Sequence, residues 1–222
     1  MEKISAHPGI REAGERIVCG FCTTGVFGKV PAEVSYMDKN CTKWSYATPT
    51  TGREPEKSNE IAMDTVALKL LGVTPELGAK VTIEYQAGDR TNEGFQETDT
   101  FILSGYWEYD DLMPVHYINV SKDYVKSVEE KWMASGEKAF RTDLNVMLPS
   151  KLNIEEQMQK IDTDLGYDWN TRDQENSARI GVNWGLTASQ LNAGMDPELL
   201  AAIAAFLLLV IFTGYLIIYN IF

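Results

Sequence analysis

The sequence predicts a mixed α/β (α+β) domain over residues 1–195, followed by one membrane-spanning helix over residues 196–222. Runs of β-branched and aromatic residues, some with apolar residues at alternate positions, predict strands. Apolar stripes at helical spacing, each preceded by a capping residue, predict helices between those strands. An uncharged apolar stretch then closes the chain. These three observations indicate a folded domain joined to a membrane helix.

The last stretch, Leu199 to Phe222, contains no Asp, Glu, Lys, Arg, His or Pro. A bilayer core about 30 Å thick requires roughly 20 apolar residues at about 1.5 Å each, so this stretch is long enough to cross it. A buried helix of a soluble protein is the alternative, but such helices seldom stay apolar on all sides for this length. Asp196, Pro197 and Glu198 are expected to start the span as cap, first helical residue and negative first turn.

The polar residues of this span fall in its second half. Tyr215, Tyr219 and Asn220 are expected to contact other membrane helices. An unpaired amide is costly in lipid, so Asn220 is expected either at such a contact or near the far membrane interface.

The part of the chain before the span is strongly acidic. All 20 Lys and Arg and all 32 Asp and Glu lie before Leu199, which gives this part the whole net charge of −12. A surface of this sign argues against nucleic acid as a partner and against docking on anionic lipid. The N-terminus lacks a long apolar region behind a basic one, so no secretory signal peptide is predicted. Two accounts stay open: a tail-anchored protein with a cytosolic domain, or a piece of a larger membrane protein.

The expected strands follow the apolar patterns along the chain. They lie around Ile17 and over Val30–Asp38, Asn59–Met63, Lys80–Tyr85, Thr100–Trp107, His116–Val120 and Leu144–Leu148. Residues 80–85 and 100–107 are expected to form an antiparallel hairpin, with Gly105 at a bulge or a close backbone approach. Residues 40–58 are polar and rich in Thr, Pro and Gly, which predicts a surface loop.

The helices are expected where a capping residue precedes an apolar stripe. Asp64 is expected to cap a short helix that Gly72 ends. Ser121 is expected to cap a second helix, and Asn153 with Glu156 has the form of a capping box for a third. Residues 121–180 are a possible strand–helix subdomain within the larger domain.

The chain contains no recognised nucleotide-binding, zinc-protease or serine-hydrolase motif. Cys19-Gly-Phe-Cys22 has C-x-x-C spacing, which is compatible with a redox or zinc pair and also with chance spacing near a strand. Chance is favoured because a second Cys pair is missing and His7 and His116 are the only histidines. No catalytic residue, cofactor or metal site is therefore expected. A membrane-anchored thiol oxidoreductase is kept as an alternative, and the role of Cys41 stays open.

Four short motifs and a glycine-containing strand follow one another in a set order. They are Gly52-Arg53-Glu54-Pro55, Asn59-Glu60-Ile61, Leu71-Gly72-Val73, Gly78-Ala79-Lys80-Val81 and the strand around Gly105. In this order and spacing the sequence resembles the FtsX-like (MacB-type) permease subunits of ABC transporters. The run from Gly214 to Phe222 is similar to the second membrane helix of Gram-positive members. The resemblance covers most of the chain from about Pro31 onward.

The resemblance implies an extracytoplasmic domain similar to the MacB periplasmic core domain, held at the plasma membrane. The implied partners are a cytoplasmic ABC ATPase subunit, a second permease copy or homologue, and membrane lipid. ATP-driven movement of the membrane helices would reposition the domain for substrate export or removal of antimicrobial peptides. Such permeases have a span before this domain and more spans after it, so the chain is expected to be a fragment. A tail-anchored interaction protein remains the alternative.

Overall fold

The computed structural model describes residues 2–88, 95–110, 113–150, 153–166, 203–213 and 215. The chain divides into two compact units. The first consists of Met1 and Glu12–Met147, and the second of Glu2–Arg11 and Leu148–Phe222. The helix and strand between residues 122 and 147, which fall within the possible subdomain predicted over residues 121–180, belong to the first unit.

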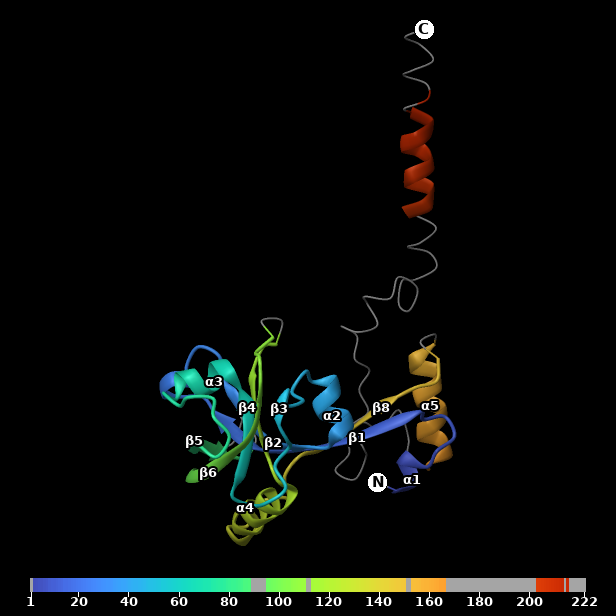
Figure 1. The fold of residues 1–222 in the computed structure, drawn as a ribbon. Coiled ribbons are helices and arrows are strands. Elements are labelled where there is room, and N and C mark those ends of the chain that lie inside the picture. The colour runs from blue at the N-terminus through green and yellow to red at the C-terminus, as the bar shows by residue number, and fades with distance from the viewer. Residues whose placement is uncertain are drawn as a thin grey trace. The chain divides into compact units, whose positions relative to one another are not determined.

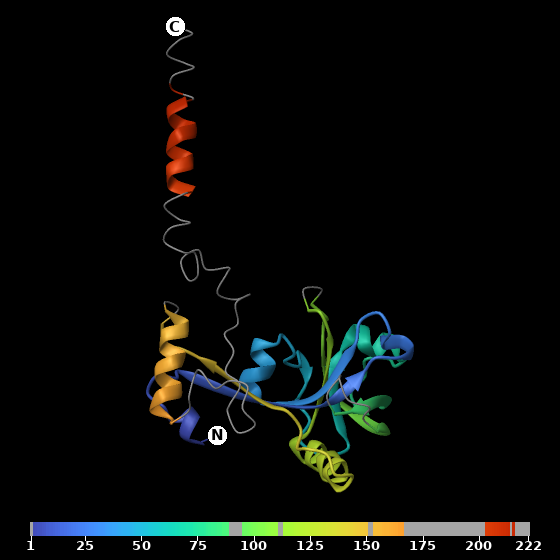
Figure 2. The same ribbon diagram turned by 180° about the vertical axis from the view of Figure 1, so that it is seen from behind.

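The first unit alternates strands with short helices, which confirms the predicted mixed α/β class (Figures 1 and 2). Its elements are β1 Glu12–Cys22, the 3-10 turn η1 Gly25–Phe27, β2 Ala32–Met37, α2 Lys39–Trp44, β3 Thr51–Gly52, β4 Glu60–Asp64, α3 Thr65–Leu70, β5 Lys80–Ala87, β6 Gln96–Trp107, β7 His116–Val120, α4 Lys122–Ala134 and β8 Thr142–Met147.

The strands of this unit close into a ring. Hydrogen bonding runs in the order β2-β7-β4-β6-β5-β1, and β1 pairs in turn with β2. The β2–β7 and β4–β6 pairs are parallel, and the other pairs in the ring are antiparallel. The expected hairpin of β5 and β6 is confirmed. Closure depends on the long strand β1, which pairs with β2 along one edge and with β5 and β8 along the other.

The main core lies where the apolar positions of the ring meet α4. Buried and exposed residues alternate along β5, as expected for a strand with one face on the core. Tyr124, Val125, Val128 and Trp132 of α4 are all buried, so the predicted apolar stripe is confirmed. α3 and α4 lie at opposite ends of the strands in both ribbon views.

Local capping signals that the sequence predicted are present in the first unit. The Asp64 carboxylate accepts from the Ala67 N–H at 2.7 Å, and the Ser121 hydroxyl accepts from the Tyr124 N–H at 3.2 Å. Gly72 follows α3 with a φ of +71°. These caps therefore begin and end the helices where their residue types predict.

The surface loop predicted over residues 40–58 was partly wrong, because it contains α2 and the short strand β3. Asp38 caps α2 by accepting from the N–H groups of Asn40 and Cys41. Only two residues of α2, Cys41 and Thr42, are buried. A helix of one and a half turns with so small a buried face leaves almost no periodic signal in the sequence.

The second unit contains α1, Glu2–Ser5, and α5, Ile154–Asp164. His7 joins its N-terminal and C-terminal parts, since Nδ1 accepts from the Gly9 N–H and Nε2 lies 3.3 Å from an Asp164 carboxylate oxygen. The predicted capping box was wrong: Asn153 has a φ of +51° and its side chain makes no capping hydrogen bond. A side-chain cap needs extended backbone at that residue, and a left-handed conformation points the amide elsewhere.

Most of the predicted span lies outside the described residues, including Asp196, Pro197, Glu198, Tyr219 and Asn220. Residues 203–213 are helical, and Tyr215 is also helical and exposed. A search of the described residues found no helix with the length and apolar character that crossing a membrane requires.

Candidate functional site

A row of small and polar residues crosses four strands on the face opposite the main core. Ser35 of β2 pairs with Asn119 of β7, Asn119 pairs with Ala62 of β4, and Ala62 pairs with Gly105 of β6. Ile118 and Val120, on either side of Asn119, belong to the main core. Because strand side chains alternate between faces, the row is set apart from that core. Its small side chains leave room for another piece of chain.

Residues 47–55, called here the covering segment, lie over this row. The Thr50 N–H donates to the Tyr106 carbonyl at 3.0 Å, and the Arg53 N–H donates to the Ser104 carbonyl at 2.9 Å. Nearer the start of the segment, the Asn119 amide donates to the Ala47 carbonyl at 3.2 Å. The segment is therefore bound both to β6 and to β7.

Two glycines allow the segment to approach β6 this closely. A Cβ on Gly105 would lie 2.4 Å from the Arg53 carbonyl oxygen and 2.9 Å from the Pro49 side chain. Gly52 has a φ of +80°, and a Cβ there would lie 2.2 Å from the Ser104 carbonyl oxygen. The close backbone approach predicted at Gly105 is confirmed, and the register of β4 against β6 shifts beside it.

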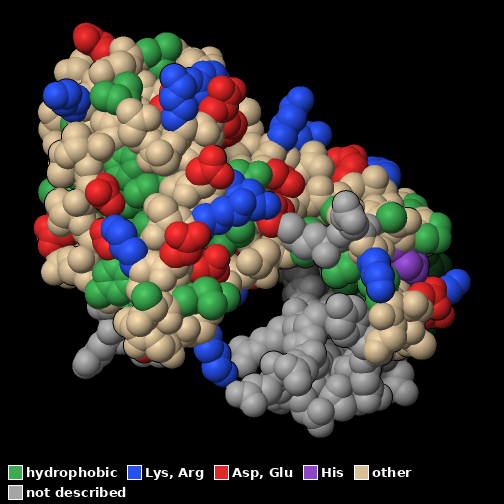
Figure 3. Space-filling view, turned by 90° about the horizontal axis from the view of Figure 1, so that it is seen from below, with side chains coloured by type: hydrophobic (Ala, Val, Ile, Leu, Met, Phe, Trp, Pro, Cys, Tyr) green, Lys and Arg blue, Asp and Glu red, His purple; other side chains and the backbone are tan. Residues whose placement is uncertain are grey.

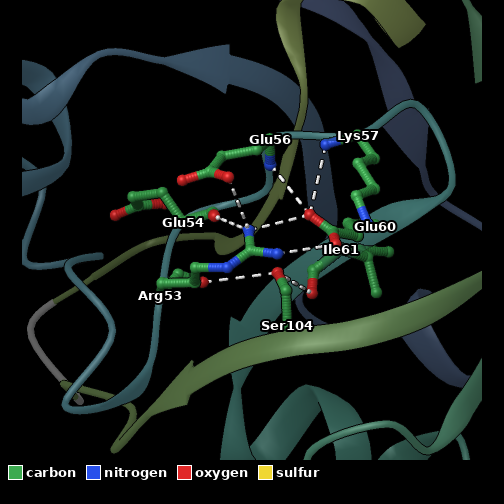
Figure 4. A network of polar contacts seen from close by, with 7 residues as sticks. All are labelled: Arg53, Glu54, Glu56, Lys57, Glu60, Ile61 and Ser104. Atoms are coloured by element: carbon green, nitrogen blue, oxygen red, sulfur yellow. Dashed lines mark hydrogen bonds and ion pairs between the residues drawn. The ribbon is translucent and has the colours of Figure 1, made fainter.

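A bidentate ion pair joins the covering segment to the start of β4 (Figure 4). Arg53 donates to the two oxygens of Glu60 at 2.8 and 2.7 Å. One of these oxygens also accepts from the backbone N–H groups of Glu56 and Lys57, at 3.0 and 3.1 Å. The Arg53 guanidinium and these N–H groups lower the pKa of Glu60 to about 2. Its carboxylate is thus the fixed centre of the turn.

Ser104 connects the same turn to the strands beneath. Its hydroxyl lies 3.1 Å from the Ile61 carbonyl and 3.3 Å from the Arg53 carbonyl (Figure 4). The Ile102 N–H of β6 donates to the Asn59 carbonyl at 2.8 Å, so the chain entering β4 is also held to β6. The turn, β4 and β6 therefore form one hydrogen-bonded joint.

The structure brings together most of the motif residues singled out in the sequence. The joint contains Gly52, Arg53, Asn59, Glu60, Ile61 and Gly105, with Pro55 in the same connection. Gly72 and Gly78 lie apart from it: both have positive φ, Gly72 after α3 and Gly78 before β5. Each therefore serves a turn of its own.

Three residues in or beside the joint were not predicted as site residues from the sequence. Glu54 lies inside the Gly52-Arg53-Glu54-Pro55 motif, but a single glutamate in a polar stretch carries no signal of its own. Asn119 carried a usable signal, because a polar residue between two apolar ones in a buried strand must find a partner. Ser104 carried none, since a serine in a half-buried strand is common.

On one face of the molecule, charged side chains of both signs are mixed rather than gathered by sign. On the face shown in Figure 3, Lys and Arg side chains alternate with Asp and Glu. One ion pair joins the exposed Lys131 of α4 to the half-buried Glu97 of β6, at 3.2 Å. The net charge of −12 therefore does not form a single acidic patch on that face.

The thiols have the properties of structural cysteines. Cys19, Cys22 and Cys41 are buried and free, so the C-x-x-C pair forms no disulfide. Burial raises the pKa of Cys19 and of Cys22 to about 12. A reactive cysteine needs an accessible thiolate near neutral pH, which burial of this kind opposes. In the part of the chain that the structure describes, no group of three or more His, Cys, Asp or Glu residues could hold a metal ion.

Replacing Glu60 with glutamine is expected to reduce stability by about 1–2 kcal/mol at neutral pH. The shape is kept but the charge that Arg53 pairs with is lost, and the Arg53 side chain is 45% exposed, so screening limits the effect. Because the pKa of Glu60 is lowered, its contribution is complete above the ordinary glutamate pKa and is lost as the pH falls toward about 2. Urea unfolding between pH 3 and 7 would measure this. Glu56→Gln, on a more exposed side chain beside Arg53, is the control, and an equal loss in both variants would contradict the assignment.

Comparison with models of protein families and with curated proteins gave no match. Among solved structures, the chain is similar to the crystal structure of the extracellular domain of the noncanonic ABC-type transporter YknZ from Gram-positive bacteria. The two share 13% sequence identity with a TM-score of 0.43, over 75% of this chain and 84% of the other.

Proposed function

We propose that this chain is the extracytoplasmic domain and adjoining membrane helix of a permease subunit in an ABC transporter of the FtsX/MacB type. Residues 1–195 face the outside of the plasma membrane, and residues 196–222 form the second membrane helix. ATP is hydrolysed by a separate cytoplasmic ATPase subunit. The domain is moved by that hydrolysis and does not itself catalyse a reaction.

The observation that carries this proposal is the convergence of the motif residues. The order of Gly52, Arg53, Glu60 and Gly105 resembles the order of the corresponding motifs in the permeases. The first and last of these residues lie 53 positions apart in the sequence. In the structure they meet in one joint between the covering segment, β4 and β6. Residues that share a motif and a place in the fold support the resemblance better than their order alone.

The joint also suits a mechanical role. Arg53 and Glu60 are held by charge-assisted bidentate hydrogen bonds, which are both strong and directional. The backbone bonds from Thr50 and Arg53 tie the same segment to β6. A domain that is displaced as a whole must resist deformation. These hydrogen bonds attach the turn on the domain surface firmly to the sheet. Transport of a substrate or removal of an antimicrobial peptide would use that displacement, together with a second permease copy.

Surface labelling in intact cells tests the proposed orientation. Ser58 is exposed in the turn before β4, and all three native cysteines are buried. A Ser58→Cys variant of the full reading frame, expressed in its native genomic setting, is expected to react with a membrane-impermeant maleimide on intact cells. The unsubstituted protein is the control for background labelling. Labelling only after lysis would place the domain in the cytosol, favour the tail-anchored alternative and overturn the proposal.

Purification of the same protein from membranes tests the proposed partner. An ATPase with Walker motifs is expected to copurify, and the complex is expected to hydrolyse ATP. A correctly oriented protein that never retains such an ATPase would refute the transporter role while leaving the orientation intact.

A further inference from the structure

The carboxyl group of Glu54 occupies an unusual position in the covering segment. One of its oxygens, Oε2, accepts from the Asn119 Nδ2 at 3.3 Å. The same nitrogen donates to the Ala47 carbonyl at 3.2 Å, so both hydrogens of the amide are used. Asn119 is 1% exposed. A glutamate side chain is thus held against a fully buried amide beneath the segment.

Two oxygen atoms at this contact have no hydrogen-bond partner among the described residues. They are Oε1 of Glu54 and Oδ1 of Asn119, and both are buried. Both atoms are acceptors when the carboxyl is ionised, so neither can satisfy the other. Leaving buried acceptors unpaired costs about 1–3 kcal/mol for each group.

A single proton on the Glu54 carboxyl would give both unpaired oxygens a hydrogen-bond partner. If Oε1 of Glu54 carries a proton, it becomes a donor, and Oδ1 of Asn119 is an unpaired acceptor on the amide that already donates to Oε2. The carboxylic acid and the amide then form a cyclic pair with two hydrogen bonds, N–H to Oε2 and O–H to Oδ1. The second N–H of the amide keeps its bond to Ala47, so every polar atom of the pair is satisfied.

The groups around Glu54 supply no positive charge that would hold it ionised. From its own segment, Arg53 is committed to Glu60 and donates only to the backbone carbonyl of Glu54. From α2, the Thr42 hydroxyl lies near the carboxyl but donates to the Lys39 carbonyl at 3.2 Å, and Lys39 and Lys43 are exposed. The charged residues of the adjoining strands are paired elsewhere: Glu33 of β2 with Arg16 of β1, Glu60 of β4 with Arg53, and Asp64 of β4 with His116 of β7.

We propose that Glu54 and Asn119 form a proton-operated clamp, which holds the covering segment on the sheet when the carboxyl is protonated and loosens it when the carboxyl ionises. The clamp responds to binding of one proton by the Glu54 carboxyl. The clamp is a property of the fold and operates whether or not the chain belongs to a transporter.

The direction of the pH effect follows from burial. Burial raises the pKa of Glu54 to about 7, although the Asn119 amide and the Thr42 hydroxyl act in the opposite direction. The folded chain therefore binds this proton more tightly than the unfolded chain. Its contribution to stability is complete below the ordinary glutamate pKa and is lost as the pH rises through about 7.

Two measurements on the full chain test the clamp. Carbon-13 NMR of the Glu54 carboxyl, assigned by its loss in Glu54→Gln, is expected to show titration near neutral pH. Hydrogen exchange of the Thr50 and Arg53 amides, corrected for the intrinsic pH dependence of exchange, reports whether the segment stays on β6. Their protection is expected to fall several-fold between pH 5.5 and pH 8.5.

Two variants separate the clamp from a general pH effect. Glu54→Gln places a permanent N–H donor opposite the Asn119 oxygen, so protection at Thr50 and Arg53 is expected to stay high and independent of pH. Glu56→Gln, in the same turn but exposed, is expected to keep the pH dependence of the unsubstituted chain. A Glu54 carboxyl that titrates in the ordinary glutamate range, or protection in the unsubstituted chain that does not change between the two pH values, overturns the proposal. Both of these readings are available even if Glu54→Gln folds poorly.

Discussion

Replacing Gly105 with alanine is expected to lower the free energy of unfolding by about 3 kcal/mol or more. The added Cβ would lie 2.4 Å from the Arg53 carbonyl oxygen and 3.0 Å from the Arg53 nitrogen. Both are backbone atoms, held by the bond from the Arg53 N–H to the Ser104 carbonyl, so they cannot move aside as a side-chain end could. Relief requires the covering segment to leave β6. Urea unfolding would measure the loss, and hydrogen exchange at Thr50 would show whether the segment has detached.

Gly28→Ala is the matched control for this substitution. Gly28 has a φ of −67°, which any residue adopts, and its nearest contact would be the Gly25 carbonyl oxygen at 3.4 Å. Alanine there is expected to change stability by no more than about 0.5 kcal/mol. If Gly105→Ala were as mild as Gly28→Ala, the close packing of the covering segment on β6 would be disproved.

Truncation of Asp64 to alanine is expected to cost about 3 kcal/mol. One carboxylate oxygen caps α3 through the Ala67 N–H at 2.7 Å, and the other lies 2.9 Å from Nδ1 of His116. Asp64 is 0% exposed and His116 is 2% exposed. The variant therefore loses a helix cap, worth about 1 kcal/mol, and leaves a buried imidazole nitrogen without its acceptor. Thermal or urea unfolding at pH 7 would give the total.

Ser121→Ala separates these two contributions. Ser121 caps α4 through the Tyr124 N–H at 3.2 Å, in the same geometry, but it joins no second buried side chain in the described contacts. Its loss is expected to cost about 1 kcal/mol. The difference between the two variants measures the Asp64–His116 contact. Equal losses would mean that this contact adds nothing to stability.

The surroundings of two glutamates in one connection shift their pKa values in opposite directions. Glu60 faces the Arg53 guanidinium and two backbone N–H groups, and its pKa is lowered to about 2. Glu54, a few residues earlier, is half-buried against a neutral amide, and burial raises its pKa to about 7. Acid therefore weakens one attachment of this region and base weakens the other, so their combined contribution to stability is greatest near the ordinary glutamate pKa, which lies between the two values.

Local signals in the sequence predicted the elements that depend on neighbouring residues. Asp64 and Ser121 cap helices as expected, because a capping side chain needs only the N–H groups two or three positions ahead. The strands β2, β4, β5, β6 and β7 were also predicted, since apolar alternation is a property of the strand itself. Where the local signal was misleading, at Asn153, the backbone conformation overrode the residue type.

By itself, then, the sequence determined the mixed α/β class, the main strands, two helix caps and the order of the motifs on which the resemblance to the permeases was stated. Only the tertiary structure decided that β1 closes the strands into a ring, that Gly52, Arg53, Glu60 and Gly105 meet in one joint, and that Glu54 lies against Asn119. The reason is physical. Caps and apolar periodicity are encoded over a few residues, whereas strand order and the contacts of a covering segment depend on which distant strands pair, and pairing is settled by the packing of the whole core.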